Sequence, residues 1–462
     1  MTDLVATTDT GATRGQAARR PRPRIHFTAK EGWINDPHGI RSADGQYHLF
    51  YQYNPEGTVW SPACHWGHAV SRDLVHWIRL PTALSPRDDE GGCWSGTTLL
   101  ENGGPTIVYT SVPPEDWGWG RIALAYPDSR SLHWTSTPGD IVIDGPPKEL
   151  GAYAFRDPCI FASESGWTMI VGAGLAGGIG AALQYSSPDA RVWRYDGVMC
   201  SRPGTDTDGA WTGTLWECPQ LIRLGEDWAL LISIWENDVL HYVAGAVGSY
   251  DGVTFTPERW TRLTHDDTAY AITSFTDFAG RRCVMAWLRE DAHHDPASSA
   301  WAGALSLPMV IEMTPDRSLR FQPHPDVDAL RLFSGLANGP LAATDPLQVQ
   351  DATTGLDVSA TLDPAQPITL ILTDPDGPLL TATVDPAGHE IQVVRRHRPP
   401  VTVPVNGNQV RIIVDADIVE IFAGHGQAAF RISPTTAAEL RISGTADRLT
   451  VHRLAPAVEG GR

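Results

Sequence analysis

The chain has 462 residues, of which 19% are charged and 42% hydrophobic, and its formal net charge is -19 at pH 7. This composition predicts a globular protein rather than a disordered one, and the length allows more than one domain. The negative charge argues against nucleic-acid binding, which needs a basic surface, and no apolar run is long enough to span a bilayer. A neutral ligand and a soluble protein fit both properties.

The first stretch, residues 1–24, is polar and rich in arginine. A secretory signal would need an apolar block followed by a cleavage site, and this stretch contains no such block. We therefore expect residues 1–24 to form a disordered N-terminal tail and the protein to be cytoplasmic. The six cysteines are scattered without the short spacing of a metal site, so in a reducing compartment they should be free thiols.

From Ile25 to about Pro308 the sequence is typical of an all-β protein, because short β-forming runs alternate with turn residues. A degenerate repeat places an aspartate shortly before an aromatic residue, at Asp73, Asp128, Asp189, Asp251 and Asp316. These aspartates are 55, 61, 62 and 65 residues apart, which fits one Asp turn per four-stranded unit. Five units predict a five-bladed β-propeller over residues 25–325, since one such sheet cannot bury both of its faces alone.

A change of composition marks a second domain. All the tryptophans precede Phe321, and a linker-like segment runs from Gly335 to Asp345. Alternating β-type runs then follow from Leu356 to Ile432, separated by turn sequences. This pattern predicts a C-terminal β-sandwich over residues 340–456.

Three acids stand in similar aromatic or cationic surroundings. Asp36, Asp157 and Glu217 lie in the runs Gly32-Trp-Ile-Asn-Asp-Pro-His-Gly39, Phe155-Arg-Asp-Pro158 and Trp216-Glu-Cys-Pro219. A tight turn, an Arg–Asp ion pair and a solvated strand end would explain them without any function. Cleavage of a glycosidic bond, however, needs one carboxyl group to protonate the leaving oxygen and another to attack the anomeric carbon or activate water. Loops from three separate blades could bring these acids together at the mouth of a propeller axis.

These three runs resemble the motifs of glycoside hydrolase family 32, the invertase, levanase and inulinase enzymes. The family pattern includes a W-x-N-D-P-N-G loop, an R-D-P turn and a W-E-C-P segment. The resemblance implies that Asp36 is the nucleophile, Asp157 the transition-state stabiliser and Glu217 the acid/base of a retaining β-fructofuranosidase. Such an enzyme would cleave terminal β-D-fructofuranosyl linkages of sucrose or short fructans, with no cofactor and no metal. The run Val419-Glu-Ile-Phe422 also resembles the accessory sandwich of that family.

The resemblance extends to a fructose-binding pocket. It implies that the pocket is lined by Asn35, Gln52, Trp60, Trp94, Ser95, Arg156, Tyr270 and Trp287. For the aromatic residues a place in the hydrophobic core is about as well supported, because both roles need buried flat surface. Two further residues, Trp117 and Trp119, could form an outer sugar platform or belong to a loop folded over its own core.

Three departures from the family pattern concern the leaving-group preference. His38 replaces the usual second Asn of the loop, Gln220 replaces a common acid, and Thr268-Ala-Tyr-Ala-Ile272 replaces the usual D-F-Y-A-P. None removes a catalytic acid.

Other functions stay open at this stage. A fructosyltransferase, or an enzyme specific for levan- or inulin-type fructans, would share the three acids. An arabinan- or xylan-acting propeller glycosidase also combines five blades with three acids, and a lectin-like propeller would bind sugar without turnover. The expected partner is a small sugar or oligosaccharide, not nucleic acid or a membrane, and self-association into a homo-oligomer stays open.

Overall fold

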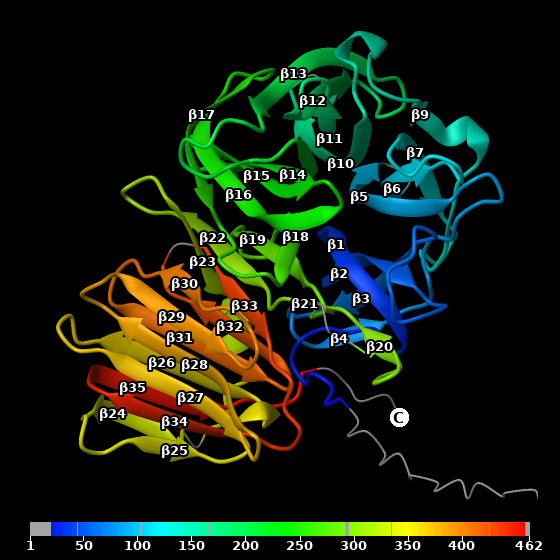
Figure 1. Ribbon diagram of the computed structural model, residues 1–462. Coiled ribbons are helices and arrows are strands. Elements are labelled where there is room, and N and C mark those ends of the chain that lie inside the picture. The colour runs from blue at the N-terminus through cyan, green and yellow to red at the C-terminus, as the bar shows by residue number, and fades with distance from the viewer. Residues whose placement is uncertain are drawn as a thin grey trace, which may run out of the picture.

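A computed structural model describes residues 20–457, apart from residues 44, 102–103, 165, 292–294, 334 and 425. Five sheets form a ring, with the first strand of each sheet nearest the central axis (Figure 1). Two further sheets form a sandwich beside the fifth blade. The predicted all-β fold, a five-bladed β-propeller followed by a β-sandwich, is therefore confirmed.

The first three blades follow one another along the chain. Blade 1 contains β1 (Gly32–Ala43), β2 (Gln46–Asn54), β3 (His65–Ser71) and β4 (Trp77–Arg79), and β20 (Trp301–Ala302) pairs with β1 in parallel. Blade 2 contains β5 (Gly92–Glu101), β6 (Gly104–Val112), β7 (Arg121–Pro127), β8 (Trp134–Thr135) and β9 (Ile141–Ile143), with short 3-10 helices at Pro138–Asp140 and Lys148–Leu150. Blade 3 contains β10 (Ala154–Ser163), β11 (Gly166–Leu175), β12 (Ile179–Ser187) and β13 (Arg194–Pro203).

The last two blades complete the ring. Blade 4 contains β14 (Leu215–Leu224), β15 (Asp227–Glu236), β16 (Val239–Tyr250) and β17 (Phe255–Arg262). Blade 5 contains β18 (Ala269–Thr276), β19 (Arg282–Leu288), β21 (Ala304–Leu305), β22 (Met309–Met313) and β23 (Leu319–Pro323).

The repeated aspartates occupy the same place in every blade, the turn between the third and fourth strands of the main path. In four blades the carboxylate accepts backbone N–H groups of its own turn, for example from His76 to Asp73 at 2.8 Å and from Thr254 to Asp251 at 2.7 Å. An Asp side chain that satisfies the turn backbone in this way explains why the repeat survives although the blades otherwise differ.

The sandwich consists of two six-stranded sheets. One contains β24 (Ala337–Leu341), β35 (Ala446–Arg453), β26 (Leu356–Leu362), β31 (Gln409–Asp415), β32 (Ile418–Phe422) and β33 (Ala428–Arg431). The other contains β25 (Leu347–Val349), β34 (Glu439–Gly444), β27 (Ile368–Asp374), β28 (Gly377–Asp385), β29 (Glu390–Arg395) and β30 (Val401–Pro404). A short helix α1 (Pro325–Asp328) precedes the sandwich, and a 3-10 helix lies at Ala352–Thr354. Inward-facing aliphatic residues of both sheets form one core.

The two domains share a buried interface. One apolar cluster contains Leu319 and Phe321 of blade 5 together with Ile418 and Phe422 of the sandwich. No helix of the described residues is long and apolar enough to cross a membrane.

The last residues of the predicted tail differ from the expectation. Arg20 forms ion pairs with Asp417 at 2.6 Å and with Glu290 at 2.9 Å, and the backbone N–H of Arg24 donates to Asp415 at 2.9 Å. Residues 20–24 are therefore part of the folded body, because the Arg20 side chain and the Arg24 backbone bind carboxylates that are hundreds of residues away in the sequence. Residues 1–19 lie outside the described residues.

Candidate active site

The innermost strand of every blade is interrupted at a corresponding place. The pairing register of β1, β5, β10, β14 and β18 shifts between Ile34 and Pro37, Trp94 and Gly96, Arg156 and Cys159, Glu217 and Gln220, and Tyr270 and Thr273. Such bulges insert extra residues into one strand and re-aim its side chains. The five bulges therefore direct side chains from five blades toward one site.

The three predicted acids lie at or beside these bulges, on strands rather than in the loops that we expected. The backbone is left-handed at Asp157, with φ of 64°, and at Cys218, with φ of 47°. Pro37, Pro158 and Pro219 follow directly in the irregular segments. A bulge tolerates proline because the missing N–H is not needed for the ladder.

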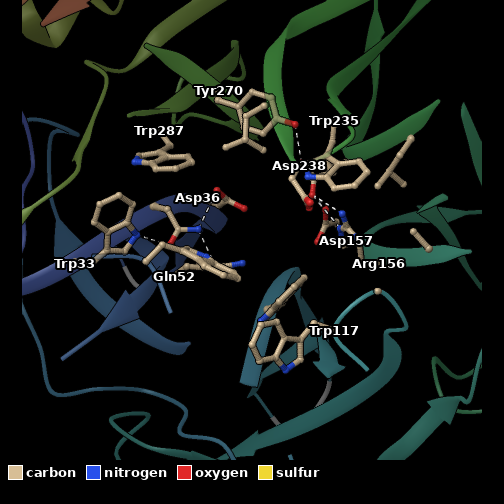
Figure 2. A pocket seen from close by; sticks show the side chains of 18 of the residues that line it. Trp33, Asp36, Gln52, Trp117, Arg156, Asp157, Trp235, Asp238, Tyr270 and Trp287 are labelled. Atoms are coloured by element: carbon tan, nitrogen blue, oxygen red, sulfur yellow. Dashed lines mark hydrogen bonds and ion pairs between the residues drawn. The ribbon is translucent and has the colours of Figure 1, made fainter. Parts of the chain in front are cut away.

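A cavity of about 670 Å³ opens where these strands meet. It is lined by all the predicted site residues except Ser95, namely Asn35, Asp36, Gln52, Trp60, Trp94, Arg156, Asp157, Glu217, Tyr270 and Trp287. Figure 2 shows Trp33, Asp36 and Gln52 on one side of the cavity and Arg156 and Asp157 on the other, with Tyr270 and Trp287 closing a third side. The fold thus gathers residues that are up to 252 positions apart, from Asn35 to Trp287.

Asp36 is held by neutral donors. The Ser95 hydroxyl donates to Asp36 Oδ2 at 2.7 Å, and the Asn35 amide donates to Asp36 Oδ1 at 3.1 Å. Gln52 forms a hydrogen bond with each of these two donors. Its Nε2 donates to Ser95 Oγ at 2.6 Å, and its Oε1 accepts from Asn35 at 2.8 Å. Ser95 therefore supports the site from behind the cavity wall.

Glu217 faces two donors of different charge. Arg156 donates from Nε to Glu217 Oε1 at 2.9 Å, with Nη2 also 2.9 Å away, and the Tyr270 hydroxyl donates to Glu217 Oε2 at 2.6 Å. Burial, reinforced by the charge of Glu217, keeps the pKa of Tyr270 well above its ordinary value. The phenol is consequently a neutral, permanent donor.

Asp157 is anchored through the backbone. The N–H of Cys218 donates to Asp157 Oδ2 at 3.0 Å, and the N–H of Asp157 donates to Thr110 Oγ1 at 2.8 Å. The Cys218 thiol lies between two of the acids, 3.6 Å from Asp157 Oδ2 and 3.8 Å from Asp36 Oδ2. Blade 4 thereby holds the Asp157 carboxylate, and blade 2 holds its backbone.

The crowding of acids raises their proton affinity. Burial raises the pKa of Asp36 to about 6; the charge of Glu217 adds to this effect and the Ser95 hydrogen bond opposes it. Burial and then the charge of Glu217 raise the pKa of Asp157 to about 7, against the opposing charge of Arg156. Such paired, buried carboxyl groups can exchange protons near neutral pH and carry negative charge toward a developing cation.

One group of three candidate metal ligands occurs among the described residues, at Asp277, Cys283 and His324. Arg281 already donates from Nε to Asp277 Oδ2 at 2.6 Å, so a fixed guanidinium supplies the positive charge there. The group belongs to a structural network of blade 5 and does not line the cavity.

Comparison with known proteins identifies the architecture around this cavity. The family described as Glycosyl hydrolases family 32 N-terminal domain matches residues 26–323. The chain belongs to this family. It is a glycoside hydrolase, as the resemblance of its motifs predicted.

Relatives in this family span most of the chain. The sucrose-6-phosphate hydrolase of Zymomonas mobilis is 29% identical over 447 residues, which cover 88% of this chain and 84% of that protein. The levanase of Bacillus subtilis is 32% identical over 324 residues, covering 63% of this chain and 45% of that protein. A solved structure of a β-fructofuranosidase from Bombyx mori superposes with a TM-score of 0.82 at 25% identity, covering 95% of both chains.

The family departures do not reach the cavity of this family 32 enzyme. His38 is buried against Trp66, with ring centroids 3.8 Å apart, and Gln220 Oε1 accepts hydrogen bonds from the N–H and hydroxyl of Ser274. Thr268 precedes β18 and does not line the cavity either. None of the three departures therefore contributes a side chain to the cavity lining.

The cavity lining contains further residues that sequence reasoning missed. These are Trp33, Gly118, Tyr153, Ala154, Leu215, Trp235, Asp238 and Leu240. Trp117 also lines the mouth, in accord with the platform alternative, whereas Trp119 packs against Gly145 of its own blade. The adjacent turn sequence Asn237-Asp238 was the one available signal for the hairpin that carries Trp235 and Leu240.

Proposed function

We propose that the protein hydrolyses terminal β-D-fructofuranosyl linkages of sucrose or short fructans and retains the anomeric configuration. The observation that carries this proposal is the meeting of Asp36, Asp157 and Glu217, from the innermost strands of blades 1, 3 and 4, in one cavity. Family membership supports the substrate class, since the relatives are named sucrose-6-phosphate hydrolase, levanase and β-fructofuranosidase.

In the proposed reaction Asp36 attacks the anomeric carbon of the fructosyl group while Glu217 protonates the leaving oxygen. Asn35, Gln52 and Ser95 hold the Asp36 carboxylate in place. Asp157 binds ring hydroxyls and supplies negative charge when the oxocarbenium develops. Water, activated by Glu217, then releases fructose from Asp36.

Trp287 adds a free donor to this arrangement. Its side chain is 6% exposed and lines the cavity, and its Nε1–H has no hydrogen-bond partner in the described structure. A buried donor without a partner destabilises the folded protein, so a ligand that accepts its hydrogen bond is favoured at this position. A sugar hydroxyl is the natural acceptor.

The experiment that tests the proposal follows the first product by NMR before mutarotation, with sucrose and short fructans as substrates. Two displacements at the same carbon should give β-fructofuranose first, and Asp36→Ala should abolish turnover because no fructosyl–enzyme bond can form. Appearance of the α anomer first would mean an inverting reaction. Activity on arabinans but not on fructosides would overturn the substrate class.

We also propose that the enzyme works in the cytoplasm, with the six cysteines as free thiols. In the structure all six are unpaired, and four of them are buried. Thiols persist in reducing compartments and tend to oxidise outside them. Fractionation of host cells tests the location; recovery of the active enzyme from the medium would contradict it.

A further inference from the structure

The hairpin between β15 and β16 forms one rim of the cavity. Its two turn residues, Asn237 and Asp238, are both left-handed, with φ of 51° and 61°, as in the tight turns that join twisted strands. Trp235, Asp238 and Leu240 of this hairpin all line the cavity. The turn geometry therefore fixes an acidic side chain at the mouth.

Buried support holds this rim in place. Arg289, which directly follows β19, donates from Nη1 to the Leu240 carbonyl at 2.6 Å and from Nη2 to the His241 carbonyl at 3.0 Å. The hairpin is thus attached to blade 5 as well as to its own blade. Asp238 is presented by a fixed element.

The direction of substrate entry follows from exposure. Asn35, Gln52 and Ser95 at the inner end are at most 5% exposed, whereas Trp60, Trp117 and Tyr153 are 45–48% exposed. The fructosyl ring must lie at the inner end, against Asp36. The leaving group must consequently extend past Glu217 into the mouth, beside the hairpin.

The charge of the described cavity lining is strongly unbalanced. It contains four carboxyl groups, Asp36, Asp157, Glu217 and Asp238, and one cationic side chain, Arg156. Arg156 already directs Nε and Nη2 to Glu217 Oε1, both at 2.9 Å. The single cation of the described lining is thus already paired with a carboxylate.

We propose that this enzyme takes uncharged leaving groups and that Asp238 is the residue that rejects a phosphate-bearing sugar. The inference rests on the proposed function and narrows its substrate class. The hydroxyls of a neutral sugar can donate to the Asp238 carboxylate while its ring stacks against the aromatic rim, whereas a phosphate dianion meets like charge. The relative from Zymomonas mobilis is named a sucrose-6-phosphate hydrolase, so the selectivity proposed here separates this chain from that relative.

Repulsion between a substrate phosphate and the carboxylates of the cavity should strongly change the ratio of kcat/KM for sucrose to kcat/KM for sucrose 6-phosphate. We expect kcat/KM for sucrose to exceed that for sucrose 6-phosphate by about 100-fold at pH 8 and low salt. Added salt should reduce the ratio, because exposed charges are screened.

The experiment compares three substrates that differ at one position of the leaving sugar. Sucrose is unsubstituted, sucrose 6-phosphate carries a phosphate on the glucosyl 6-oxygen, and raffinose carries a neutral galactosyl group there. Asp238→Asn should lower the sucrose to sucrose 6-phosphate ratio about tenfold, and Asp238→Lys should lower it further. Asn is well tolerated in a left-handed turn, so the first variant should fold normally.

A matched control is Glu226→Gln, in the β14–β15 turn at the other end of the same blade. The Glu226 side chain is 97% exposed and does not line the cavity. Its substitution removes the same charge from the protein but should leave the substrate ratio unchanged.

Each outcome decides between the proposals. Sucrose 6-phosphate cleaved as well as sucrose, or raffinose rejected as strongly as the phosphate, would overturn the charge selectivity while the proposed function stands. A wild-type ratio that Asp238→Asn leaves intact would overturn the assignment to Asp238. Cleavage of a short fructan alone would overturn the selectivity proposed here for sucrose-type substrates. If neither a short fructan nor any of the three substrates is cleaved, the proposed function itself fails.

Discussion

Asp36 must be ionised to attack, yet its surroundings oppose the charge. Burial raises its pKa to about 6, and the Ser95 hydrogen bond is the strongest of the contacts that lower it. A carboxylate that is destabilised but still ionised at neutral pH is a better nucleophile than a fully solvated one. The pKa values of Asp36 and Asp157, about 6 and about 7, should therefore together determine how activity falls at acid pH.

Ser95→Ala tests this balance. Without the hydroxyl the Asp36 carboxylate loses a 2.7 Å hydrogen bond, so its pKa should rise further. The acid limb of kcat/KM, to which Asp157 contributes near pH 7 and Asp36 near pH 6, should move upward by a fraction of a pH unit and become steeper. Activity at pH 5.5 should accordingly fall more than activity at pH 8. Ser201→Ala, an exposed serine of β13, is the control, and an unchanged acid limb in Ser95→Ala would contradict the role given to Asp36.

At the scale of elements, the site depends on bulges that sequence patterns describe poorly. Asn, Asp, Pro and Gly form turns, so the sequence around Asp36 predicts a loop, but the same residues suit a bulge within a strand. Blade number was predictable because an Asp turn recurs in each sheet. The hairpin between β15 and β16 that forms the cavity rim could not be predicted. Its residues Trp235 and Asp238 belong to no family motif and reach the cavity only because the five blades close into a ring.

Two arginines connect the sandwich to the cavity wall. Arg431 of β33 donates from Nε to the Arg289 carbonyl at 3.1 Å and from Nη2 to the Leu288 carbonyl at 3.0 Å. The Arg289 guanidinium lies 5.2 Å from the centre of the Tyr270 ring and also donates to the Leu240 carbonyl. Arg289 is therefore a positioning residue for the phenol that donates to Glu217.

Arg289→Lys should keep the charge but lose the paired hydrogen bonds that the guanidinium donates to the Leu240 and His241 carbonyls. We expect kcat/KM for sucrose to fall about tenfold, mainly through kcat, because Tyr270 and Glu217 are displaced. Arg396→Lys, which disturbs the Arg396–Asp374 ion pair within the sandwich, is the matched control. It should lower the melting temperature without a comparable loss of kcat. Equal losses of kcat in both variants would contradict a positioning role for Arg289.

At the scale of the molecule, the segment before β1 joins the two domains. His26 is fully buried, with Nδ1 2.9 Å from Asp415 and Nε2 3.1 Å from Glu420, both on the sandwich. The backbone N–H groups of Arg24, Ile25 and His26 also donate to Asp415. Burial alone would lower the pKa of His26, but the hydrogen bonds to Asp415 and Glu420 outweigh it and raise the pKa to about 9.

This raised pKa makes the stability of the whole molecule depend on pH. The folded state binds the His26 proton more tightly than the unfolded state, in which the pKa of a histidine side chain is about 6.5. The contribution of protonated His26 to the free energy of unfolding is complete below pH 6.5, declines as pH rises, and is lost as pH passes through 9. It amounts to about 3 kcal/mol at its maximum.

His26→Gln should therefore lower the melting temperature by several degrees at pH 6 and by much less at pH 10, as calorimetry across this range can measure. His133→Gln, which changes an exposed histidine of blade 2, should show no such trend. If the difference between wild type and His26→Gln were the same at both pH values, the domain contact would not depend on a protonated His26.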